Sequence, residues 1–195
     1  MTVTLDTLAA ALASTELYAL LCRFDVYLDK PEERHHHIYL IDRYARIDLI
    51  ASDPAGGHFL LCHPDGHVVH ASSEGQASVI AVNLDDRIDL IVTYPYWGSI
   101  ISHDLHGMRA AVVEAEEAAL EEQPQLETWR AVLRAAFGIP RESAGALEAL
   151  HRAVALNDGL VVRVSTNPDF PYAVRPLVPG RPNRRSRSIK CSRSA

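Results

Sequence analysis

The chain has 195 residues, 48% of them hydrophobic, which favours a folded domain with a sizeable core over a disordered chain. Its 19 Lys and Arg residues and 25 Asp and Glu residues give a formal net charge of −6. Three widely separated cysteines exclude a disulfide framework and indicate a reducing, cytoplasmic environment. The apolar run 8–21 is too short to cross a bilayer, so we expect neither a leader peptide nor a membrane partner.

The charge is unevenly divided along the sequence. Residues 180–195 hold five Arg, one Lys and no acidic residue, which leaves 13 basic against 25 acidic residues, or −12, in the rest of the chain. A body of this sign attracts basic partners and repels nucleic acid. We interpret 1–179 as a single domain and 180–195 as a disordered basic tail, the one segment with which nucleic-acid contact remains an alternative.

The first half of the chain predicts one helix followed by strands. Leucines at helical spacing predict an amphipathic helix over residues 5–21. Alternating or continuous apolar runs then predict strands at 37–42, 46–51, 58–63, 67–72 and 77–82. Pro54, Gly56 and Gly57 mark a turn before the third of these strands. The pair Asp65–Gly66 predicts a two-residue type I′ turn, which needs positive φ at both positions.

The second half is mainly helical. Asn83 is a predicted N-cap, with Asp86 three residues later in a capping-box-like position, for a helix over 84–92. Further helices are expected at 104–123, 126–137 and 143–156, followed by a strand at 160–165. The order of elements predicts an α+β fold in which a mostly antiparallel sheet has helices packed against it. The helices of 104–156 form an extension beyond the sheet-containing core.

A hairpin rich in histidine suggests a metal site. It contains His58, Cys62, His63, His67 and His70. Because side chains alternate along a strand, His63 and His70 should share one face of the sheet, and the other three side chains the opposite face. The His-x-His spacing that points two imidazoles to one side is absent from this hairpin, and the members of the triplet at 35–37 alternate faces if that segment forms a strand. We therefore expect no metal and no cofactor, and the alternative is a small metal-dependent or ligand-binding enzyme built on hairpin 58–70.

Other catalytic signatures are also missing. The sequence has no phosphate-binding glycine loop, no G-x-S-x-G and no H-E-x-x-H. Acidic pairs such as Glu116–Glu117 fall on the polar side of a predicted helix, where solvated charges are the rule. The sequence therefore contains no recognisable set of catalytic residues, and we expect a protein that is not an enzyme.

The segment 46–92 carries a series of short motifs, in chain order Ala51–Ser52–Asp53, Gly56–Gly57, Gly66 before Val68–Val69, Glu74–Gly75, Ile80–Ala81 and the helix 84–92. Together they resemble the SUKH superfamily, whose bacterial members are largely immunity proteins against polymorphic toxins. The predominance of Arg over Lys is typical of a GC-rich bacterial genome. The resemblance implies a non-catalytic α+β domain with a surface that binds and blocks a toxin, often a nuclease.

A basic toxin domain suits an acidic body, because complementary charge speeds capture. Six residues are candidate contacts with such a protein partner: Glu74, Asp85, Asp86, Tyr94, Tyr96 and Trp97. Tyr and Trp are enriched at interface hot spots, which favours the aromatic group as a contact. The alternative for this group is a plug between the sheet and the helices.

Overall fold

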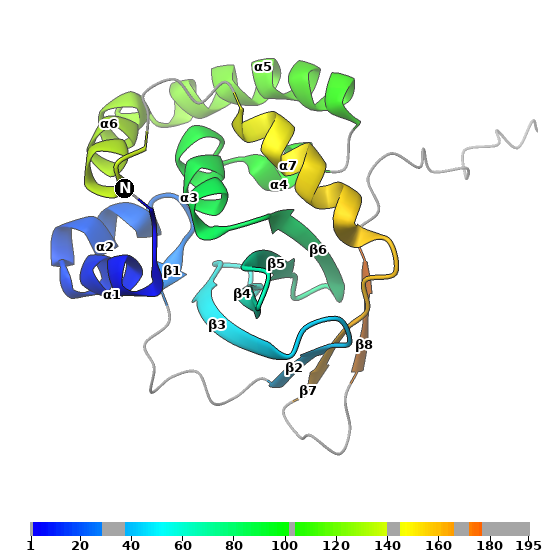
Figure 1. Cartoon of the computed structure of the whole chain (residues 1–195). Coiled ribbons are helices and arrows are strands. Elements are labelled where there is room, and N and C mark those ends of the chain that lie inside the picture. Colours follow the sequence, from blue (N-terminus) through cyan, green and yellow to red (C-terminus); the bar gives the residue numbers. More distant parts are fainter. Residues whose placement is uncertain (1, 29–37, 102–103, 140–144, 166–171, 177–195) are drawn as a thin grey trace, which may run out of the picture.

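The computed structural model describes residues 2–28, 38–101, 104–139, 145–165 and 172–176 (Figure 1). The histidine triplet at 35–37, the start of the helix predicted at 143–156, and the tail 180–195 lie outside these residues. Predictions made for those segments remain predictions.

Eight strands form one sheet in the described part of the chain, in the order β1-β3-β4-β5-β6-β8-β7-β2. Their bounds are β1 Tyr27–Leu28, β2 Ile38–Ile41, β3 Arg46–Ser52, β4 His58–His63, β5 His67–Ala71, β6 Gln76–Ala81, β7 Val162–Ser165 and β8 Tyr172–Pro176. Neighbouring strands are antiparallel except β6 and β8, which form a short parallel pair. The sheet curves strongly, so that β2 comes back beside β3 (Figure 1).

Helices cover one side of this sheet (Figure 1). Their bounds are α1 Leu5–Ala13, α2 Thr15–Cys22, α3 Leu84–Thr93, α4 Trp97–Ile100, α5 Leu105–Glu122, α6 Leu126–Phe137 and α7 Ala146–Val154, which continues into a 3-10 turn, Ala155–Asn157. Asn83 caps α3 by accepting a hydrogen bond from the Asp86 backbone N–H at 2.7 Å, and Gly138 ends α6 in the left-handed conformation at φ 66°. The predicted α+β class and most of the predicted elements are confirmed.

The side chains on the two faces of the β4–β5 hairpin pack into two separate hydrophobic cores. Phe59, Leu61 and Val68 point to the larger core beneath the helices. Leu60 and Cys62 point to a smaller core on the inside of the curved sheet, which β2, β7 and the end of α7 help to close. The predicted alternation along this hairpin is confirmed, because neighbouring residues enter different cores.

The helix predicted over 5–21 is two helices in the structure. The Ser14 side chain accepts a hydrogen bond from the Leu17 backbone N–H at 3.4 Å and so caps a new helix, α2. The two axes differ by 103°. Among the described residues no single helix is long and apolar enough to cross a membrane, and only this bent pair has the length and composition together.

Two local features of the sheet differ from the prediction. Strict alternation in β3 places Ala51 with Ile47 and Leu49, but a bulge at Ile50 breaks the register, so that Ile50 and Ala51 both enter the larger core. The prediction of a two-residue type I′ turn at Asp65–Gly66 is wrong. Cys62 pairs with His67, so the loop is longer than two residues, and only Gly66, at φ 78°, has the required positive φ. Pro64 explains this difference, since it has no N–H to donate to the ladder bond that a two-residue loop requires.

A buried polar residue fastens the end of α7 to the sheet. Asn157 is 6% exposed; its Oδ1 accepts a hydrogen bond from the Val79 backbone N–H at 2.7 Å, and its Nδ2 donates to the Ser78 hydroxyl at 2.6 Å. A second bulge, at Ile80, lies next to this N–H on β6. Asn157 therefore stabilises an irregular strand, a role that its position between the predicted helix 143–156 and the predicted strand 160–165 did not indicate.

We expect Asn157→Ala to lower the free energy of unfolding by about 3 kcal/mol, because it leaves two buried polar groups on β6 without their partner. Urea denaturation at pH 7 measures this change. Asp158→Ala is the matched control, because its side chain is exposed and the substitution should change stability by less than about 0.5 kcal/mol. Similar losses for both variants would contradict the role given to Asn157.

Candidate functional site

Each histidine of the hairpin is engaged by a different neighbouring side chain. The pairs are His58 with Tyr39, His67 with Tyr44 at 2.8 Å, His63 with Asp48 at 2.9 Å and His70 with Asp53 at 2.7 Å. The rings that share a face thus bind separate carboxylates. Burial also raises the pKa of the Cys62 thiol to about 12, so the thiolate that binds metals is scarce at neutral pH. Within the described ranges, no three His, Cys, Asp or Glu side chains are grouped to hold a metal ion.

The Asp53–His70 pair is built on the turn between β3 and β4. The Asp53 backbone N–H donates to the Gly57 carbonyl, and the Gly57 backbone N–H donates to Asp53 Oδ1, both at 2.9 Å. Oδ2 of Asp53 then faces Nε2 of His70 on β5. The hydrogen bond with His70, assisted by that from Gly57, lowers the pKa of Asp53 to about 2. The carboxylate is therefore ionised at any physiological pH and holds the imidazole in one orientation.

Gly57 is required by this pair. A Cβ at position 57 would lie 2.3 Å from Asp53 Oδ2 and 2.7 Å from His70 Nε2, well inside van der Waals contact. The two side chains therefore pack directly over the backbone of Gly57. The double glycine in the sequence predicts the turn. The requirement for glycine at position 57 itself arises from the Asp53–His70 pair, which leaves no room for a Cβ.

A buried arginine completes the cluster. Arg87, on α3, is 2% exposed, and its guanidinium lies 4.0 Å from the Phe59 ring centroid and 5.5 Å from that of Trp97. Its Nη1 and Nη2 donate no hydrogen bond to any described residue. Burial lowers the pKa of Arg87 to about 9, while the charge of Asp53 acts in the opposite direction. We call Asp53, Phe59, His70, Arg87 and Trp97 the Arg87 cluster.

The Arg87 cluster combines an oriented imidazole with a cation that lacks hydrogen-bond acceptors, as a site for an anion does. Access is the obstacle. His70 is only 8% exposed, and Trp97 lies against both its ring, at 5.1 Å, and the Phe59 ring, at 6.1 Å. A ligand reaching Arg87 would have to displace Trp97. In the described structure the cluster therefore joins α3 and α4 to the sheet.

A second arginine has every nitrogen engaged. Arg130 on α6 donates to Glu116 and Glu127 and to the backbone carbonyls of Val92 and Thr93, at 2.5 to 3.1 Å. The Tyr96 hydroxyl donates to the same Glu116 carboxylate at 2.6 Å. Hydrogen bonds from Arg130 lower the pKa of Glu116, which stays ionised as the shared acceptor. This network connects α5 and α6 to the end of α3.

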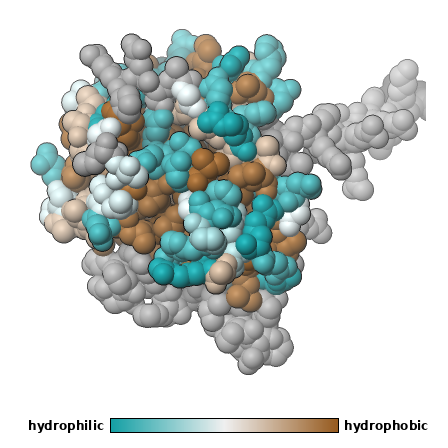
Figure 2. All heavy atoms as spheres, viewed as in Figure 1, coloured by the Kyte–Doolittle hydropathy of each residue, from teal (hydrophilic) through white to brown (hydrophobic). Residues whose placement is uncertain are grey.

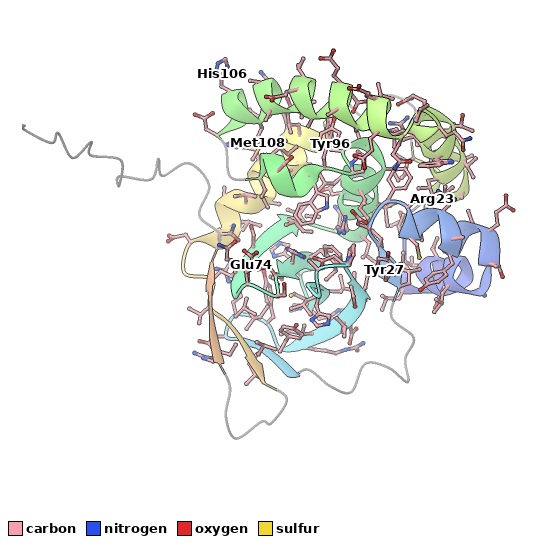
Figure 3. All side chains as sticks on the ribbon, turned by 180° about the vertical axis from the view of Figure 1, so that it is seen from behind. Arg23, Tyr27, Glu74, Tyr96, His106 and Met108 are labelled. Atoms are coloured by element: carbon pink, nitrogen blue, oxygen red, sulfur yellow. The ribbon has the colours of Figure 1, made fainter. Side chains whose placement is uncertain are left out.

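The predicted aromatic contacts lie largely inside the structure. Tyr94, Tyr96 and Trp97 are each half-buried and pack against the larger core. Tyr96 lies beneath α5, as Figure 3 shows, and Trp97 packs against Phe59 and His70 within the Arg87 cluster. These placements favour the plug alternative for the aromatic group. Whether any of the three also contacts a partner stays a prediction.

The predicted acidic contacts are placed apart from one another. Asp85 and Asp86 lie in the first turn of α3, where Asp85 Oδ1 accepts a hydrogen bond from the Val3 backbone N–H at 2.6 Å and burial raises the pKa of Asp86. Glu74 is exposed in the turn between β5 and β6, at the opposite end of β6 from α3 (Figure 3). The six candidates therefore do not form one continuous surface.

Sequence reasoning missed Asp53, Arg87 and Arg130 as organising residues. The spacing of Asp53 to Gly57 is a usable signal, because aspartate often accepts hydrogen bonds from the backbone of its own turn. Arg87 shares the buried side of α3 with Leu84, Ile88 and Ile91, a position where a charge is unusual. Comparison with known proteins gives no match to a family model, a curated protein or a solved structure.

We expect Gly57→Ala to separate Asp53 from His70 and to destabilise the fold by about 2 kcal/mol or more, because backbone and two side chains must move to admit the methyl group. Thermal and urea unfolding measure the loss. Gly98→Ala is the matched control, since a Cβ there meets no atom within 4 Å. Equal stability of the two variants would show that the pair does not pack on Gly57.

Stability should fall in acid partly through Asp53. Its pKa in the folded protein, about 2, lies below the ordinary 3.8, so its contribution is complete above about pH 5 and is lost as the pH falls through 2. Between pH 5 and 2 the wild type should lose up to about 2 kcal/mol more than Asp53→Asn, which keeps the shape but cannot titrate. Urea denaturation across this range tests the claim, and parallel curves would refute it.

Proposed function

We propose that this protein is a non-enzymatic immunity-type protein that binds and neutralises a cognate toxin domain in the cytoplasm of a bacterial cell. The segment 46–92, which carries the SUKH resemblance, supports this proposal. Its residues form consecutive antiparallel strands β3 to β6 followed directly by α3, with helices against one face of the sheet. That is the kind of architecture that the resemblance implies.

The single observation that carries the proposal is the acidic surface. The chain outside 180–195 has a formal charge of −12, and exposed carboxylates are concentrated on α5, at Glu114, Glu117, Glu121 and Glu122. A nuclease toxin has a basic active site because it binds phosphates. An acidic protein competes for such a surface, and its charge accelerates the encounter. Occlusion needs no reaction chemistry in the inhibitor.

A second candidate function is binding of a small anion at the Arg87 cluster, which corresponds to the ligand-binding alternative for hairpin 58–70. The observation that favours it is that Arg87 Nη1 and Nη2 lack acceptors among the described residues. Arg87→Met separates the two candidates, because it keeps an apolar chain against Phe59 and Trp97 but removes the charge. Toxin neutralisation should survive this substitution, whereas anion binding should not.

The test is co-expression with a toxin domain encoded next to the gene. We expect the full chain to co-purify with that domain and to restore growth of cells that express it, and we expect the association rate to fall about tenfold or more as salt rises from 50 to 500 mM. Pull-down, growth curves and stopped-flow mixing measure these three results. The proposal fails if no neighbouring gene encodes a toxin domain, or if such a domain is neither bound nor neutralised.

A further inference from the structure

Helix α5 is the least buried long helix of the described structure. It has 18 residues, so it is about 27 Å long, and Met108 is its one buried side chain. By comparison, the nine-residue helix α7 buries six. Figure 1 shows α5 along the outside of the molecule, and Figure 2 shows hydrophobic atoms among hydrophilic ones there.

The inner side of α5 is fixed to the rest of the protein. Met108 is fully buried, Leu105, Val112 and Ala119 pack against the larger core, and Glu116 binds Arg130. The helix therefore has a defined orientation, and the residues on its other side face outward as a fixed array.

The exposed His106 lies one turn before Ala110 on the same side of α5. After Arg109, the exposed residues of α5 are all acidic or apolar, and six of them recur at helical spacing on one side of the helix. They are Ala110, Val113, Glu114, Glu117, Leu120 and Glu121, which we call the acidic face of α5. Val113 is 70% exposed and Leu120 is 37% exposed. The carboxylates of Glu114, Glu117 and Glu121 form no ion pair with the described residues. No Lys or Arg occurs on α5 after Arg109, which itself binds Glu148.

Two features of this face are unfavourable when the protein is alone: repulsion between its carboxylates and exposure of its apolar side chains to water. Glu114 and Glu117 are three residues apart and Glu117 and Glu121 are four apart, so like charges repel along the helix. Val113 and Leu120 lie beside them with their apolar surface in water. A basic partner with its own apolar residues relieves both costs, because its Arg or Lys groups separate the glutamates and its apolar groups cover Val113 and Leu120.

We propose that the acidic face of α5 is the surface on which the cognate toxin docks, and that the matching toxin surface consists of Arg or Lys residues around an apolar centre. This inference rests on the proposed function and deepens it by naming the contact. Glutamates 114, 117 and 121 pair with the basic groups, and Val113 and Leu120 form the dry middle of the interface. The surface is separate from the earlier candidates Glu74, Asp85 and Asp86.

The experiment compares two triple charge reversals in the full-length chain. The test variant is Glu114→Lys, Glu117→Lys and Glu121→Lys. The control is Glu16→Lys, Asp65→Lys and Asp158→Lys, which changes net charge equally at exposed positions on α2, the β4–β5 loop and the turn after α7. Circular dichroism and urea unfolding verify that both variants fold. The probe is the toxin domain encoded next to the gene, with affinity and rates from biolayer interferometry.

We expect the test variant to bind at least about 100-fold more weakly, mainly through faster dissociation, and to lose neutralisation in cells. The control should bind within about fivefold of the wild type, with its change confined to the association rate. Val113→Ser with Leu120→Ser should weaken binding about tenfold or more without altering charge.

Failure of the docking surface and failure of the function give different results. If the wild type neutralises the toxin and the test variant does so equally well, the surface is wrong and the proposed function stands. If both triple variants lose affinity to the same degree, net charge alone acts and the surface is again wrong. If the wild type itself neither binds nor neutralises the toxin, both proposals are overturned.

Discussion

Alternation along the β4–β5 hairpin is the constraint on which the rest of the molecule depends. It sends Phe59, Leu61 and Val68 toward the helices and Leu60 and Cys62 toward the inside of the curved sheet. Two cores follow from one hairpin because a strand cannot place neighbouring side chains on the same side. The same rule separates the hairpin histidines, so each bonds to the partner that its own face provides. The four hairpin histidines are thus distributed over four different partners, Tyr39, Tyr44, Asp48 and Asp53.

A few buried polar residues then hold the layers together. Asn157 joins the end of α7 to an irregular part of β6, Asp53 and His70 connect a turn to the neighbouring strand, and Arg130 joins three helices. Each of these groups has its hydrogen-bonding capacity satisfied locally, which is the condition under which burial of a polar group is tolerated. Arg87 differs, since aromatic rings replace acceptors around its guanidinium. Such a cation is held by packing and by the field of Asp53.

The distribution of polar groups distinguishes the interior from the outer surface. Inside, carboxylates such as Asp53 and Glu116 are matched with a positive or hydrogen-bonding partner. Outside, on α5, carboxylates repeat without counter-charges beside exposed apolar residues. This contrast is the observation from which the proposed docking surface is argued. Inside, Arg87 is the exception, because its Nη1 and Nη2 lack acceptors among the described residues, while outside the long helix α5 displays acidic and apolar side chains together.

The sequence by itself determined the elements whose signals are local. The α+β class, the positions of β3 to β6 and the Asn83 cap all follow from periodicity and capping chemistry within a few residues. It also determined which histidines share a face of the sheet. The observed loop at Pro64 is longer than the predicted turn, but it shifts the pairing by an even number of residues, so each side chain keeps its predicted face.

Only the tertiary structure decided the break at Ser14, the bulge at Ile50 and the hydrogen-bond partners of Asp53, Arg130 and Asn157. It also showed that Tyr94, Tyr96 and Trp97 pack on the core and that α5 leaves its acidic face exposed. The Asp53–His70, Arg130–Val92 and Asn157–Val79 hydrogen bonds join residues far apart in the chain. Their energies depend on which element covers which, and local periodicity does not encode that information.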